Sequence, residues 1–169
     1  MLTKSLMLIF TLLGISGVTA SEANRIAYAE TILEYGNSIG QIKHRFGPPQ
    51  RSSTKALAVR YNQTKSELLT LIYPSLSITV WKGEFDDNSS RELLTNVTFD
   101  SCRSIQITPC FIGHTSEELI NYFGKPNSEF SSKTSFIYMI AFGDGGFAPI
   151  KFELKNSIVK SASIESYVD

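Results

Sequence analysis

The chain has 169 residues, of which 16 are Lys or Arg and 16 are Asp or Glu, so its formal net charge is zero. A neutral chain offers no basic surface for nucleic acid or for an anionic membrane, and we expect neither as a partner. Apolar residues make up 42% of the chain and aromatic residues 11%. This composition predicts a folded protein and excludes a disordered or low-complexity one.

Residues 1–20 have the features of a cleaved export signal. Lys4 precedes an apolar stretch at 6–18, and small residues lie directly before Ser21, where a signal peptidase would cut. The apolar stretch is shorter than the roughly 20 residues that a membrane span needs. An uncleaved N-terminal anchor is the alternative. We expect the exported protein to begin at Ser21, to lie in the periplasm or be secreted, and to have no membrane span.

A helix is predicted next, at 22–35, and is followed by the first copy of an internal repeat. Residues 36–49 align without gaps with residues 113–126. Four pairs of positions are identical: Gly36 and Gly113, Phe46 and Phe123, Gly47 and Gly124, Pro49 and Pro126. Each copy predicts a short helix that begins with a capping box and ends at a glycine followed by a proline. The capping pairs are Ser38 with Gln41, and Thr115 with Glu118.

Strands are predicted after each repeated helix, from alternating apolar and polar residues bounded by turn residues. In the first half they lie at 57–62, 68–73, 76–81 and 93–99, with a polar connection at 82–92. In the second half they lie at 136–142, 147–154 and 158–167, with turns at 143–146 and 155–157.

The only cysteines, Cys102 and Cys110, lie between the two halves. In an oxidising compartment they would most simply pair in a structural disulfide. A zinc site needs about four ligands, and only His44 and His114 remain to complete one. The sequence contains no motif that predicts a metal, a cofactor or a set of catalytic residues. A nucleophilic Cys110 beside His114 would require the thiol to be free, which the exported context opposes.

Helices followed by antiparallel strands, twice, predict an α+β fold. We expect two tandem helix-plus-antiparallel-sheet units, residues 21–103 and residues 104–169. The helices would pack on one face of the sheet, and the other face would be solvated and concave.

The repeated pattern Gly-x-Ser/Thr-x-x-Gln/Glu-Ile/Leu-x-x-x-Phe-Gly-x-Pro, followed by strands, resembles that of a known superfamily. It is similar to the β-lactamase-inhibitor-protein-like fold, which includes the SmpA/OmlA outer-membrane assembly lipoproteins. The resemblance covers most of residues 36–169 and implies an exported protein that binds proteins or serves in the envelope and performs no chemistry. The chain has no lipobox cysteine, which departs from the lipoprotein branch. The shared motif is structural, so it transfers no binding residue.

The candidate binding residues come from strand register. In the strand at 76–81, Trp81 lies opposite the face that carries Leu76, Ile78 and Val80. An exposed Trp among polar and charged groups has the composition of a binding hot spot. The predicted partner-binding residues are Trp81, Arg60, Tyr138, Lys151 and Glu153. The alternative is that Trp81 covers a sheet edge or packs under the connection at 82–92.

These observations predict an exported, non-enzymatic binding protein that engages another exported or envelope protein through a concave sheet face. An inhibitor or immunity-type role fits the expected tandem architecture. Two alternatives remain: an assembly or structural factor of the bacterial envelope, and a module that binds a small ligand or a glycan.

Overall fold

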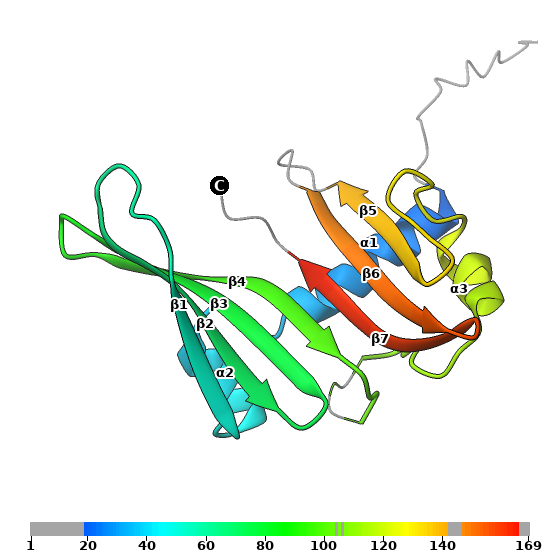
Figure 1. Ribbon diagram of the computed structural model, residues 1–169, viewed down its shortest axis with the longest axis horizontal. Coiled ribbons are helices and arrows are strands. Elements are labelled where there is room, and N and C mark those ends of the chain that lie inside the picture. Colours follow the sequence, from blue (N-terminus) through cyan, green and yellow to red (C-terminus); the bar gives the residue numbers. More distant parts are fainter. Residues whose placement is uncertain (1–18, 104, 106, 142–146, 166–169) are drawn as a thin grey trace, which may run out of the picture.

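The computed structural model describes residues 19–103, 105, 107–141 and 147–165 (Figure 1). Residues 1–18 of the predicted export signal and the predicted turn at 143–146 lie outside the described residues. The first helix, α1 (Ala20–Leu33), agrees with the helix predicted at 22–35. Because it begins at Ala20, the expected cleavage site falls in its first turn.

Seven strands form one antiparallel sheet in the order β1-β2-β3-β4-β7-β6-β5. The strands are β1 (Arg51–Ala56), β2 (Gln63–Tyr73), β3 (Leu76–Phe85), β4 (Ser90–Phe99), β5 (Ser135–Ala141), β6 (Phe147–Lys155) and β7 (Ile158–Glu165). The remaining helices are α2 (Ile39–Phe46), which precedes β1, and α3 (Ser116–Phe123), which precedes β5. Figure 1 shows α1 and α2 behind the sheet.

The prediction of two tandem helix-plus-sheet units is wrong, because the strands of both halves belong to one sheet. Strands β4 and β7 pair from Asn96 opposite Glu165 to Phe99 opposite Ala162. The buried side chains of both halves also form one hydrophobic core. Helix α1 precedes the strands of the first half but packs against α3, β5 and β6 of the second.

Hydrogen bonds attach the start of α1 to the end of α3. The Asn24 side-chain amide donates to the Tyr122 carbonyl at 2.9 Å, and Arg25 Nε donates to the Phe123 carbonyl at 2.7 Å. Carbonyls in the last turn of a helix have no partner within the helix, so these side chains satisfy groups that α3 leaves open. The Arg25 guanidinium also lies 5.3 Å from the centre of the Tyr138 ring.

The two repeated helices have the caps that the sequence predicts. In α2 the capping box joins Ser38 and Gln41, and in α3 it joins Thr115 and Glu118. Each helix ends at a glycine with positive φ, 78° at Gly47 and 76° at Gly124. Residues with a side chain rarely adopt this conformation, which explains why glycine recurs at the end of both helices.

The strand boundaries differ from the prediction at two places. Residues 57–60 form no strand, because the chain turns there between β1 and β2, and Tyr61 has a positive φ of 51°. The predicted polar connection at 82–92 is instead the end of the β3–β4 hairpin. Its charged residues are accommodated by ion pairs such as Lys82 with Glu84 at 3.3 Å. Glu92 accepts a hydrogen bond from the Ile39 backbone N–H at 2.8 Å, at the start of α2.

The segment between the two halves carries the predicted disulfide. Cys102 and Cys110 are bonded, with their Cα atoms 5.7 Å apart. Ile105, Ile107 and Phe111 in or beside this loop are buried in the core. Among the described residues, no helix is long and apolar enough to cross a membrane.

Replacing both cysteines by alanine should lower the free energy of unfolding by about 2.5 kcal/mol, because the short disulfide loop restricts the unfolded chain. Denaturant unfolding of the oxidised protein and of the double variant measures this difference. Thiol titration of the unfolded, unreduced protein should find no free cysteine. Two reactive thiols would contradict the assignment.

The capping boxes of α2 and α3 should respond differently to acid. The Glu118 carboxylate accepts hydrogen bonds from the Thr115 backbone N–H at 2.7 Å and from Thr115 Oγ1 at 2.9 Å, and His114 lies beside it. These bonds hold the pKa of Glu118 below its ordinary value of 4.5. The stabilisation is therefore present above that value and is lost as the pH falls through the lower pKa of the folded state. The equivalent residue in α2, Gln41, is neutral at every pH.

The Glu118→Gln variant should consequently be less stable than the natural protein near neutral pH, and the difference should shrink below about pH 4 as Glu118 becomes protonated. Thermal unfolding of both proteins across this range measures the difference. A difference that does not change with pH would show that the carboxylate charge contributes nothing at this cap.

Candidate functional site

One face of the sheet is not covered by the helices, and we call it the open face. Core residues such as Leu71, Ile78 and Ile150 alternate along the strands with residues that point to this other side. Directly opposed residues on paired strands point to the same side of a sheet, so the register assigns every strand residue to one face. The open face carries, among others, Lys55, Leu68, Thr70, Thr79, Trp81, Asn96, Ile137, Met139, Lys151, Glu153, Ser163 and Glu165.

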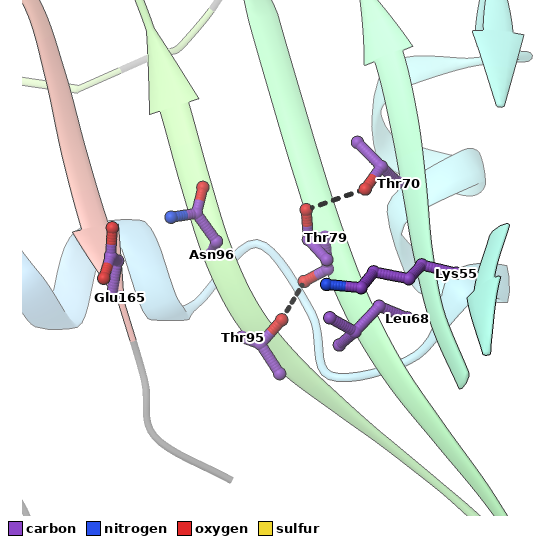
Figure 2. Close-up of a pocket in the computed structure, with 7 residues that line it drawn as sticks. All are labelled: Lys55, Leu68, Thr70, Thr79, Thr95, Asn96 and Glu165. Carbon is purple, nitrogen blue, oxygen red and sulfur yellow. Dashed lines mark hydrogen bonds between the residues drawn. The ribbon is translucent and has the colours of Figure 1, made fainter. Parts of the chain in front are cut away.

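A hollow of about 350 Å³ lies on the open face over β1 to β4 and reaches β7 at Glu165 (Figure 2). We call it the polar hollow because six of its seven lining residues are polar or charged. Its lining residues come from five strands: Lys55, Leu68, Thr70, Thr79, Thr95, Asn96 and Glu165. Thr70 and Thr79 share a hydrogen bond of 3.1 Å between their hydroxyls, and Thr95 Oγ1 donates to the Thr79 carbonyl at 3.1 Å. The threonines are thereby held in place as the floor of the hollow.

Charged groups lie on the two sides of this floor. Figure 2 shows the Lys55 side chain extending over the strands from β1, with Asn96 and Glu165 on the side of β4 and β7. The register of β3 and β4 shifts between Thr79 and Val80, a β-bulge next to Thr95. The hollow therefore offers a cation, a carboxylate, hydroxyls and one apolar side chain, Leu68. Such a set can bind polar and charged groups.

A second hollow of about 320 Å³ is more apolar and shares Glu165 with the polar hollow. It is lined by Phe130, Ile137, Met139, Pro149, Lys151 and Glu165. The Phe130 side chain is 55% exposed, which is unusual for a large apolar group. Because Glu165 borders both hollows, they form one continuous surface over β1 to β5.

Trp81 lies on the predicted side of the sheet, but its side chain is only 8% exposed. The indole ring lies over Gly83, and its Nε1 donates to Ser66 Oγ at 2.9 Å. The exposure that suggested a hot spot is therefore not found, since the indole packs along the strands. A role of Trp81 in binding stays a prediction.

Tyr138 and Arg60 lie away from the open face. Tyr138 is fully buried in the core, where desolvation raises its pKa to about 12 against the opposing effect of Arg25. Tyr138 lies directly opposite the core residue Ile150, so its side chain is on the helix side of the sheet and cannot contact a partner on the open face. Arg60 is exposed in the turn before β2, and its backbone N–H donates to Gln63 Oε1.

Lys151 and Glu153 lie on the open face in β6 and form an ion pair with each other. Lys151 also borders the second hollow. Strands β4 and β7 separate β6 from β3, which puts these residues at least roughly 14 Å from Trp81 across the sheet, and the register aligns Lys151 with Ser77, four residues along β3 from Trp81. The five predicted residues are thus not gathered at one place.

Sequence reasoning missed most of the polar hollow. It placed a strand at 57–62, and so did not place Lys55 in a strand at all. The alternation predicted at 76–81, which puts Trp81 opposite Leu76, Ile78 and Val80, also puts Thr79 on the solvated face. Thr79 lies in the floor of the hollow. Thr70 alternates with Leu69 and Leu71 in the printed sequence and could have been found in the same way.

Other candidate catalytic groups have structural partners. Cys110 is in the disulfide, and His114 Nδ1 lies 3.2 Å from Glu118 Oε1. In the part of the chain that the structure describes, no group of three His, Cys, Asp or Glu residues could hold a metal ion.

No protein-family model, curated protein or solved structure matches this chain. The resemblance to the β-lactamase-inhibitor-protein-like superfamily therefore stays a prediction.

Two glycine-to-alanine changes should have opposite effects on stability, because Trp81 lies over Gly83 whereas the space beside Gly40 is open. A Cβ at Gly83 would lie 2.6 Å from Trp81 Cζ2 and still closer to Cη2, so the indole must move. Gly83→Ala should lower the free energy of unfolding by about 1–3 kcal/mol. At Gly40 in α2 the nearest atom to a new Cβ is Ser38 Oγ at 3.9 Å, so Gly40→Ala should raise stability by about 0.5–1 kcal/mol. Denaturant unfolding measures both, and a stable Gly83→Ala protein would contradict the position of the indole.

Proposed function

We propose that this chain is an exported, non-enzymatic binding protein and that it engages another exported or envelope protein through the open face. The observation that carries the proposal is the one-sided arrangement of the helices, which leaves the other face of a seven-stranded sheet uncovered. Adjacent strands lie about 4.8 Å apart, so this face is roughly 29 Å wide. A surface of that width can supply the roughly 800 Å² that a stable protein interface buries on each partner.

The composition of the face favours a protein over a glycan as the partner. It combines a polar hollow with an adjacent apolar one, and protein interfaces commonly join apolar centres to polar rims. A glycan site would use an exposed aromatic platform. Trp81, the aromatic residue expected to provide it, is packed against the sheet, and of the residues that line the two hollows only Phe130 is an exposed aromatic one. An inhibitor or immunity-type role is one specific form of this proposal, but the tandem architecture from which it was expected is not found. The family resemblance supports protein binding or an envelope role.

The Cys102–Cys110 disulfide supports an oxidising compartment outside the cytoplasm. Residues 1–20 have the sequence features of an export signal, which also supports a location outside the cytoplasm. We therefore place the proposed partner in the periplasm or among secreted proteins.

A photo-crosslinking residue at Glu165, which borders both hollows, should capture one defined protein when the chain is exported by its native host. The same group at Asn121, exposed on α3, should not capture it. With the captured protein purified, Glu165→Arg should weaken its binding by at least about tenfold, and Asn121→Arg should leave it unchanged. Equal capture at both positions, or equal affinities of both variants, would remove the open face as the binding surface.

A further inference from the structure

Strand β1 lies at one end of the sheet and is exposed along its whole length. All six residues from Arg51 to Ala56 are exposed, and β2 is the strand with which β1 pairs. An edge strand presents a row of backbone N–H and C=O groups that another strand can pair with.

The register shows which backbone groups face outward. Leu57 N–H donates to the Ser66 carbonyl at 2.8 Å, so Leu57 and Ser66 form a hydrogen-bonded pair. Hydrogen-bonded pairs recur at every second residue of an antiparallel ladder. Arg51, Ser53 and Lys55 therefore bond to β2, while the backbone groups of Ser52, Thr54 and Ala56 point to the outer edge. Among the described residues, no other segment bonds to that edge.

The opposite edge of the sheet is closed by the chain itself. At β5, the Ile137 carbonyl accepts from Asn127 N–H at 2.9 Å, and Ile137 N–H donates to Ser131 Oγ at 2.9 Å. Met139 N–H donates to Asn127 Oδ1 at 2.9 Å. The loop before β5 thus occupies the groups that a further strand would need. The two edges differ, and β1 is the one left available.

The open edge also carries a charge pattern. Arg51 and Lys55 lie on the open face, four residues apart, and neither forms an ion pair with any described residue. Pairing of β1 with a second copy of itself would bring these cations together on one face, which is unfavourable. The charges therefore oppose a dimer through β1 and favour an incoming strand with acidic residues.

We propose that β1 binds an extended, acidic segment of the partner protein as an eighth strand. Residues of the added strand opposite Arg51 and Lys55 would be four positions apart and on the open face, so carboxylates there would pair with both cations. Backbone hydrogen bonds to Ser52, Thr54 and Ala56 would hold the segment, as in other cases of strand addition. Because Lys55 also lines the polar hollow, the added strand would continue the open face. This inference rests on the proposed function, since it assumes a protein partner.

The test uses blocked, fluorescently labelled peptides and the full exported chain. The probe peptide is Thr-Glu-Val-Thr-Val-Glu-Thr, whose carboxylates have the required spacing, and the control peptide has Lys in place of both Glu. Fluorescence anisotropy should show that the acidic peptide binds at least about tenfold more tightly, because two attractive pairs replace two repulsive ones. The preference should decrease with added salt.

Two protein variants identify the edge as the site. Thr54→Pro removes an outward N–H without removing a bond to β2, and proline is tolerated on the outer side of an edge strand; it should abolish binding of the acidic peptide. The double variant Arg51→Glu with Lys55→Glu should reverse the preference, so that the Lys peptide binds more tightly. Arg60→Glu, in the adjacent turn, is the matched control and should change the preference little.

Equal affinities for the two peptides, no saturable binding at about 1 mM, or an unreversed preference in the double variant would each overturn the proposal. If Thr54→Pro fails to fold, the reversal of preference alone decides. Crosslinking at Glu165 tests the open face separately. Capture at Glu165 without peptide binding would reject the eighth strand and leave the proposed function intact. Peptide binding without capture at Glu165 would support strand addition at β1 and reject the open face as the binding surface.

Discussion

The pairing of β4 with β7 is the constraint on which the remainder of the structure depends. Four residue pairs, from Asn96 with Glu165 to Phe99 with Ala162, join the strands of both halves into one sheet. Once the halves share a sheet, buried residues on its helix side form one core, and the helices leave the opposite side uncovered. The polar hollow is formed mainly by β1 to β4, and the joining of the halves adds Glu165 of β7 to its lining.

Helix α1 packs beneath the second half on the other side of the sheet. Its aromatic residue Tyr28 contacts the rings of Phe111, Phe123 and Phe152, all from the second half. Asn24 and Arg25 satisfy the last carbonyls of α3. A helix that precedes the strands of the first half is thus part of the core beneath the second half.

The two edges of the sheet differ in whether a further strand can pair with them. One edge is closed by the loop around Asn127, whereas β1 at the other edge is exposed and carries Arg51 and Lys55. A partner on the open face could therefore extend across β1 but not across β5. Trp81, which strand register and composition single out for binding, is covered and joins β3 to β2 through its hydrogen bond to Ser66. Binding on this face would depend on polar and charged groups around the hollows more than on a single aromatic anchor.

The sequence by itself determined the features that depend on neighbours a few residues away. The capped helices α2 and α3, the glycines that end them, the alternation of β3 and β6 and the close Cys102–Cys110 pair were all predictable, because their interactions span at most eight positions. Only the tertiary structure decided that β4 pairs with β7, that α1 packs on the second half, that residues 51–56 rather than 57–62 form the edge strand, and that Trp81 is covered. These outcomes arise from contacts between distant segments. A local pattern indicates which residues will be buried, but it does not determine which distant segment will pack against them.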